Sequence, residues 1–221
     1  ELFWIGADTE SFKLSGDLSQ NGYSGFIDVN RSGLPHNDSN STFATDSNRS
    51  AIETTQSDIT GISPYIWINT ALYFPYAVKD QSVSDMFYNY DTVNGEPPSA
   101  LFDISSMTQV GSDVNITLSR KPETIVERFF LTYSAYALVQ NNGDLILYYN
   151  LRPWIGPIAP LADYQDSTTL IDNVRSFEYW SEGEGSIIRF RLCVHDDSRY
   201  MAGSGDDEEE LIFCKESAII R

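Results

Sequence analysis

The chain has 221 residues, 41% of them hydrophobic and 13% aromatic, which excludes a disordered protein and allows a substantial buried core. With 32 acidic and 14 basic residues the net charge is −18, which argues against binding of nucleic acid or of an anionic membrane by general electrostatics. No run of about 18 apolar residues exists, so the sequence predicts no transmembrane helix. The acidic surplus suits a solvated secreted surface or calcium ligands.

The amino-terminal half alternates apolar and polar stretches. Residues 2–6 and 22–29 predict short strands, because they are rich in aromatic and β-branched side chains. Residues 30–50 are dominated by Asn, Ser, Asp and Thr without an apolar period, which predicts a surface loop. Residues 65–78 predict one or two short buried strands between prolines. The stretch 95–98 predicts a turn or linker.

The clearest predicted hairpin follows at residues 129–149. A long apolar and aromatic run, 129–139, is separated from a second run, 145–149, by a segment that contains Asn142 and Gly143. An Asn-Gly pair adopts the positive φ angles that a tight hairpin turn needs. Two prolines shortly after the second run predict that the strand ends there.

The carboxy-terminal region predicts a meander. Residues 176–180 and 188–194 alternate between apolar and polar side chains around a Glu-Gly turn, and 217–220 would form the closing strand. In the second of these strands Ile188, Phe190, Leu192 and Val194 share one face, whereas Arg189, Arg191 and Cys193 share the other. We therefore expect an apolar core face and an outer face that carries the cysteine.

Cys193 and Cys214 are the two cysteines of the chain, and they flank one terminal loop. Two free thiols are the alternative, and no further cysteine offers metal-ligand partners. We expect a disulfide between them, which places the protein outside a reducing cytosol. Closing this loop would stabilise the fold by roughly 3 kcal/mol.

The order of these segments resembles the globular region of type IV pilin-like proteins, in particular minor pseudopilins of type II secretion or DNA-uptake systems. The matching stretches are Phe130–Leu138, Asp144–Tyr149, Asp172–Glu178 and Arg189–Cys193, with shorter similarities at Trp4–Gly6 and Gly25–Asp28. The amino-terminal apolar helix of that family is absent from this sequence, which departs from the family pattern.

The resemblance implies an α+β fold, a pilin-like globular domain dominated by antiparallel β-sheet. It implies a single domain over 1–221, with a lobe at 1–98, a variable loop at 30–50 and a sheet core at 125–221. The expected function is that of a structural subunit of a periplasmic pseudopilus, without catalysis. The expected partners are other pseudopilin subunits and the bacterial inner membrane, reached through the missing helix, with a periplasmic globular domain and no nucleic acid. The apolar stretches around Trp4 and 65–78 are the expected partner surfaces.

A calcium site is the one cofactor hypothesis. Asp28, Asn30 and Ser32 place oxygen atoms at alternate positions before Gly33, as in the opening of an EF-hand-type loop. The closing bidentate glutamate is missing, because Ser39 occupies its place, and an ordinary polar turn explains the same residues. The acidic loop between the cysteines, 196–210, offers further carboxylates, although a solvated loop accounts for them equally well.

Two further functions compete with the pilin interpretation. A secreted β-rich carbohydrate-binding module is one, because aromatic rings can stack on sugars. In that case Trp154, beside prolines, is the best candidate for an exposed contact, while Trp67 and Trp180 are expected to pack in the core. A secreted hydrolase with an acidic pair is the other. Catalysis is not expected, since the two histidines, His36 and His195, lie in no catalytic motif.

Overall fold

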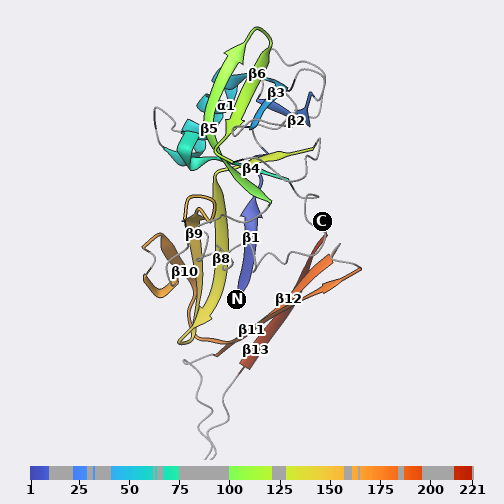
Figure 1. Ribbon diagram of the computed structural model, residues 1–221. Coiled ribbons are helices and arrows are strands. Elements are labelled where there is room, and N and C mark those ends of the chain that lie inside the picture. Colours follow the sequence, from blue (N-terminus) through green and yellow to red (C-terminus); the bar gives the residue numbers. More distant parts are fainter. Residues whose placement is uncertain are drawn as a thin grey trace, which may run out of the picture. The chain divides into compact units, whose positions relative to one another are not determined.

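The computed structural model describes residues 1–9, 22–28, 32, 41–61, 63, 67–74, 100–120, 128–156, 161–163, 165–183, 187–195 and 212–220. These residues form 13 strands, one α-helix and two short 3-10 helices (Figure 1). The strands make three sheets, and the chain divides into two compact units. Unit 1 comprises 1–3, 136–149 and 161–221, and unit 2 comprises 4–135 and 150–160.

Unit 2 contains a six-stranded sheet in the order β2-β3-β6-β5-β4-β7. Its strands are β2 (Tyr23–Ile27), β3 (Ser41–Ser47), β4 (Ala71–Tyr73), β5 (Leu101–Val110), β6 (Asp113–Leu118) and β7 (Phe130–Thr132). Along β6 every second residue is buried, which is the pattern of a strand with one face on a core. The five ladders that join neighbouring strands of this sheet are antiparallel.

The core of unit 2 is aromatic. The ring of Phe74 packs against those of Phe43, Phe102 and Phe129, with ring centroids 6.5, 5.5 and 6.5 Å away. All four side chains are buried. Edge-to-face packing of this kind adds to the free energy gained by burying the rings.

Helix α1 (Arg49–Thr60) closes one side of this core with Ile52. The helix begins after Asn48, whose side chain accepts a hydrogen bond from the N–H of Ala51 at 3.2 Å. It ends at Gly61, whose φ of 69° is a left-handed conformation that glycine adopts without strain. The described ranges contain no helix with the length and apolar character needed to span a membrane.

A polar cluster is buried beside this core. The carboxylate of Asp8 accepts a hydrogen bond from Nε2 of Gln56 at 2.9 Å, and the hydroxyl of Tyr23 donates to the Asp8 carbonyl at 2.6 Å. The hydroxyl of Thr70 donates to Oε1 of Gln56 at 3.3 Å. Burial, and secondarily the charge of Asp8, raises the pKa of Tyr23 above its ordinary value of 10.0.

A second sheet has four strands in the order β1-β8-β9-β10. They are β1 (Leu2–Gly6), β8 (Ser134–Asn141), β9 (Asp144–Leu151) and β10 (Ser167–Ile171). The turn between β8 and β9 has φ of 51° at Asn142 and 87° at Gly143, so the predicted Asn-Gly hairpin is confirmed.

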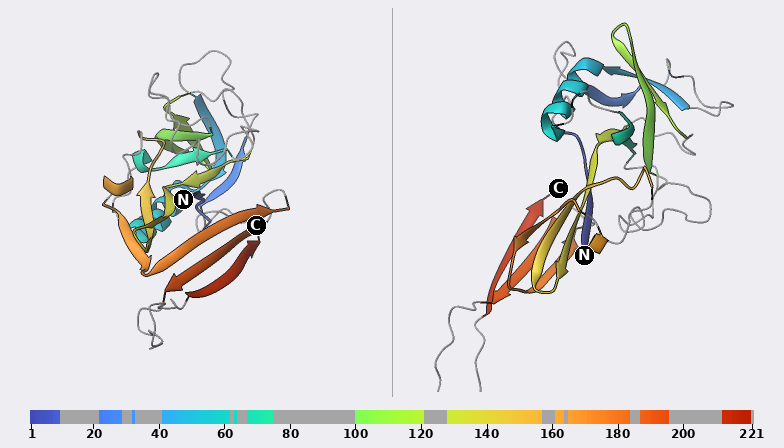
Figure 2. Two further views of the ribbon diagram at one scale, coloured as in Figure 1. Left: turned by 90° about the horizontal axis from the view of Figure 1, so that it is seen from below. Right: turned by 90° about the vertical axis from the view of Figure 1, so that its left-hand side faces the viewer.

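The third sheet belongs to unit 1 and consists of β11 (Val174–Glu182), β12 (Ile187–His195) and β13 (Ile212–Ile220), in that order (Figure 2). The ladder between β12 and β13 is regular from Ile187↔Ile220 to His195↔Ile212. The predicted meander is therefore confirmed, and its closing strand begins five residues earlier than expected.

The expected α+β pilin-like fold is wrong. The described residues are built almost entirely from antiparallel sheet, and their one α-helix has 12 residues. The aromatic and β-branched composition favours strands throughout, and the short helix contacts β5, an interior strand of the six-stranded sheet.

Three local expectations are also corrected. Residues 41–47, expected in a polar loop, form β3, because Phe43 and Ala44 are buried and the hydroxyl of Thr45 bonds to the Phe26 carbonyl and to the hydroxyl of Ser47. In the segment 65–78, β4 is a buried strand as predicted, but Trp67–Asn69 is a 3-10 helix. Leu72 and Phe74 are fully buried and cannot be the expected partner surface.

Candidate functional site

The side chains of the three-stranded sheet divide between two faces. Trp180 on β11 lies directly opposite Arg189 on β12, and Glu178 lies opposite Arg191. Because residues opposite each other in an antiparallel ladder share a face, these four side chains and Glu182 lie on one side of the sheet. We call this set the Trp180 face.

Ion pairs order the polar groups of the Trp180 face. Nε of Arg189 donates to Oε2 of Glu182 at 2.9 Å, and Nη2 of Arg191 donates to Oε2 of Glu178 at 2.6 Å. The indole N–H of Trp180 donates to Oε1 of Glu182 at 3.2 Å. These hydrogen bonds, led by the one from Arg189, hold the pKa of Glu182 below its usual value. Glu182 thus bonds both the indole ring and the guanidinium.

Trp180 is exposed, with 36% of its surface accessible. The expectation that it packs in the core is therefore wrong. A half-exposed indole surrounded by ordered charged groups can accept a flat apolar ligand surface and offer hydrogen bonds at its rim.

The opposite face of the same sheet is apolar. It carries Phe177 and Tyr179 on β11 and the alternate residues Ile188, Phe190, Leu192 and Val194 on β12. The rings of Phe177 and Tyr179 lie 6.2 Å apart, and the Tyr179 hydroxyl donates to the carbonyl of Glu1. The β12 residues of this face are half-buried, so the predicted core face is only partly covered.

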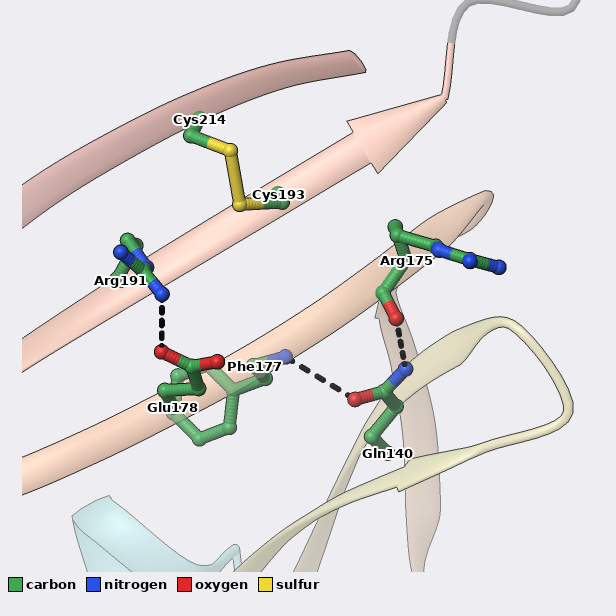
Figure 3. The surroundings of a disulfide bond; sticks show 7 residues. All are labelled: Gln140, Arg175, Phe177, Glu178, Arg191, Cys193 and Cys214. Carbon is green, nitrogen blue, oxygen red and sulfur yellow. Dashed lines mark hydrogen bonds and ion pairs between the residues drawn. A yellow bond between two sulfur atoms is a disulfide. The ribbon is translucent and has the colours of Figure 1, made fainter. Parts of the chain in front are cut away.

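Gln140 of β8 joins this sheet to its neighbour within unit 1 (Figure 3). Its Oε1 accepts a hydrogen bond from the N–H of Phe177 at 3.0 Å. Its Nε2 donates to the carbonyls of Val174 and Arg175 at 3.2 and 3.1 Å. The carboxamide therefore forms hydrogen bonds with backbone groups at the start of β11, in the way that a neighbouring strand would.

Cys193 and Cys214 form a disulfide, as predicted. The two residues are direct partners in the β12–β13 ladder (Figure 3). The bond therefore ties the two strands near the carboxy-terminal end of β12 and the amino-terminal end of β13. The carboxylates of that loop fall outside the described residues.

Trp154, the predicted sugar contact, is buried, with 2% of its surface exposed. The expectation that it is an exposed contact is therefore wrong. Trp154 lies in a turn after β9 and directly follows Pro153. The side chain of Pro153 is also buried. Trp67 packs against the core of unit 2, in line with its prediction, and its indole N–H donates to Glu53 at 3.1 Å.

The calcium hypothesis stays a prediction. Asn30 lies outside the described residues, so the structure does not describe all three expected ligands. The hydroxyl of Ser32 donates to the Asp28 carbonyl at 2.5 Å and accepts from the N–H of Ala44 at 3.1 Å. Those bonds are what a polar turn requires. Over the ranges the structure covers, no group of three or more His, Cys, Asp or Glu side chains is placed to hold a metal ion.

A polar cavity of about 780 Å³ lies in unit 2 at the amino-terminal end of α1. Its lining includes Asp46, Asn48, Arg49, Glu53 and Gln109. Arg49 is already bonded there, to Glu53 at 2.7 Å and to the carbonyl of Met107 at 2.7 Å. Among the described residues that line it none is aromatic, so this part of the cavity offers hydrogen bonds without a stacking surface.

No protein-family model, curated protein or solved structure matches the chain. The expected membership in the type IV pilin-like family is wrong, because three antiparallel sheets and a single short helix make up the described residues. The expected roles as a pseudopilin and in type II secretion depended on that family and are therefore not supported by the fold. The similarities that suggested the family were short strand segments, which recur in many β proteins.

Sequence reasoning singled out Trp154 and missed the Trp180 face. The information for this face was present, because Glu178, Trp180 and Glu182 alternate on one strand while Arg189 and Arg191 alternate on the next. A two-residue period places each set on one side. What the sequence did not reveal is which side of the sheet is exposed.

Proposed function

We propose that the chain is a β-rich carbohydrate-binding module that contacts neutral glycans through the Trp180 face. The observation that carries this proposal is the exposed Trp180 ring flanked by two ordered Arg–Glu pairs on one side of a sheet. The β-rich architecture fits such a module better than it fits a pilin subunit.

The chemistry of a sugar ring matches this surface. The C–H bonds on one side of a pyranose form an apolar patch that packs on an indole ring. Its hydroxyl groups, which both donate and accept hydrogen bonds, fit carboxylates and guanidinium groups at the rim. Because Glu182 already holds Trp180 and Arg189 in place, less side-chain entropy is lost on binding.

The charge of the protein selects among glycans. A net charge of −18 repels polyanionic chains such as sulfated or uronic-acid polymers. Both arginines of the face are neutralised by their glutamate partners. Neutral glycans are therefore the favoured ligands.

The test is a glycan array followed by calorimetry with the best neutral ligand. Replacing Trp180→Ala removes the stacking surface and should weaken binding on the order of tenfold or more, whereas Trp180→Phe retains part of it. Phe26→Ala is the matched control, since it deletes an exposed aromatic ring in unit 2. The proposal fails if no glycan binds, or if Trp180→Ala binds as tightly as the wild type.

A further inference from the structure

The two edges of the three-stranded sheet differ. The edge at β11 is occupied at its start by the Gln140 carboxamide, which bonds to Val174, Arg175 and Phe177. The edge at β13 pairs with β12 on one side and has no further strand among the described residues. An uncovered edge presents backbone donors and acceptors to any strand that can align with it.

Strand β13 has charged residues at its centre but lacks the other features that usually protect an edge. It is nine residues long, contains no proline and follows β12 without a bulge. Lys215 and Glu216 are its charged residues, and they lie at its centre. Near its ends Phe213 and Ile219 are 51% and 56% exposed. Such a strand favours pairing with another strand.

The disulfide shows which backbone groups of β13 point outward. The Cα atoms of Cys193 and Cys214 lie 4.1 Å apart, a spacing typical of a non-hydrogen-bonded pair in an antiparallel ladder. The N–H and C=O groups of Cys214 therefore point away from β12. By alternation, the same holds for Ile212, Glu216 and Ala218.

We propose that β13 is the interface of a two-fold symmetric dimer, in which two copies of the chain pair antiparallel along this strand with Phe213 opposite Ile219 of the second copy. A two-fold axis perpendicular to the sheet pairs residues of the same face. With the axis at Glu216, Cys214 lies opposite Ala218 of the second copy. These outward-pointing residues exchange backbone hydrogen bonds across the interface.

The same register brings the exposed apolar residues together. Phe213 and Ile219 of the second copy form a non-hydrogen-bonded pair, the type in which side chains approach most closely. The symmetry produces this contact twice. An axis at Lys215 would place that cation opposite itself, and an axis at Ser217 would place Lys215 opposite Ile219. Of these three central registers, the one centred on Glu216 matches the apolar residues.

Glu216 opposes this dimer, because the axis places it opposite its own copy. Like charges facing each other across strands are destabilising. Each chain also carries a net charge of −18, so two copies repel at low ionic strength. We therefore expect a reversible dimer that salt strengthens, with a dissociation constant in the range of transient complexes.

One consequence rests on the proposed function. The two-fold axis leaves both Trp180 faces on the same side of a continuous six-stranded sheet. Strand spacing and register then separate the two indoles by about 25–30 Å. A single long glycan could contact both and gain avidity.

Sedimentation velocity over about 5 to 500 µM protein tests the dimer, because weak interfaces associate in this range. The wild type should form dimers, Phe213→Ser and Ile219→Ser should remain monomeric, and Glu216→Gln should dimerise about twofold to fivefold more tightly. Val110→Ser, which alters an exposed residue of unit 2, is the control. A wild type that stays monomeric throughout, or Phe213→Ser and Ile219→Ser variants that still dimerise, would overturn the proposal.

Disulfide trapping tests the register with the full chain. A mixture of Phe213→Cys and Ile219→Cys proteins under mild oxidation should give covalent dimers, while each variant alone should give none above the level of a Val110→Cys control. Dimers trapped in either variant alone would overturn the proposed register. Glycan binding is measured separately with Trp180→Ala, which leaves β13 intact, so failure of one proposal is distinguishable from failure of the other.

Discussion

The carboxamide of Gln140 accepts a hydrogen bond from the backbone N–H of Phe177 at 3.0 Å and so attaches β8 to the start of β11. Two more bonds run from the same side chain to the carbonyls of Val174 and Arg175. One side chain thus satisfies three backbone groups of a strand that belongs to another sheet. It also protects the start of the β11 edge, since those groups are no longer available to another chain.

Replacing Gln140→Ala should lower the free energy of unfolding by about 1–3 kcal/mol, since three hydrogen bonds to backbone groups are lost together. Gln140→Glu keeps the acceptor for Phe177 but loses the donor, and should have a larger effect than the exposed control Gln165→Ala. Urea unfolding followed by fluorescence measures all three. An unchanged midpoint for Gln140→Ala would show that water replaces the carboxamide without cost.

Removal of the disulfide in a Cys193→Ser, Cys214→Ser double variant should cost roughly 3 kcal/mol, because the bond closes a loop with a sequence separation of 21. The expected result is a lower thermal midpoint together with faster hydrogen exchange in β12 and β13. The oxidised and reduced wild type should differ by a similar amount. Equal stability of the two forms would contradict the prediction.

The Trp154→Ala variant should be destabilised by about 3–5 kcal/mol, because this side chain is almost fully buried and its removal leaves a cavity. By contrast, Trp180→Ala should change stability by less than about 1 kcal/mol, since the ring is half-exposed. Thermal unfolding of both variants distinguishes a core tryptophan from a surface one. A stable Trp154→Ala protein would contradict the burial.

The titration of Glu182 should report its contact with Arg189. The pKa of Glu182 is lowered first by the hydrogen bond from Arg189, so its carboxyl carbon should titrate below the ordinary value of 4.5. A lowered pKa stabilises the folded state above the ordinary pKa, and this contribution is lost as the pH falls through the lowered value. Carbon-detected NMR of the wild type and of Arg189→Met measures the shift, which should shrink in the variant.

The raised pKa of Tyr23 predicts that the folded state loses stability at alkaline pH. Burial raises its pKa in the folded state above the ordinary 10.0, so the unfolded chain releases this proton first. Stability is therefore fully present below pH 10 and falls as the pH rises beyond it. Tyr23→Phe should flatten this slope while costing about 1 kcal/mol at neutral pH through the lost bond to Asp8. Denaturant unfolding across this pH range checks both effects.

The expected absence of catalysis and the possible calcium site stay predictions, as do the bacterial inner-membrane location with a periplasmic domain and the partner subunits. The last two came from the pilin resemblance, which the fold does not support. Calcium titration monitored by calorimetry tests the site at Asp28, Asn30 and Ser32 directly.

Helix α1 shows a part of the fold that the sequence contained but that was missed. Asn48 and Gly61 are suitable capping residues on either side of a twelve-residue stretch, in which Ile52, Gln56 and Ile59 follow a helical period. The surrounding Ser and Thr residues concealed this pattern, because they favour loops and caps when they stand alone. Packing of Ile52 into the aromatic core decides in favour of the helix.

The sequence by itself determined the local features of the carboxy-terminal region. The Asn142-Gly143 hairpin follows from a residue pair that adopts positive φ angles. Strands β11 and β12 follow from the alternation of their side chains between two faces. The disulfide follows from two cysteines that flank one segment. The tertiary structure alone decided which strands share a sheet and which face is covered. The run 129–139, for instance, is divided at Tyr133 between two sheets. Alternation defines two faces of a strand, but only packing against distant residues buries Trp154 and leaves Trp180 exposed.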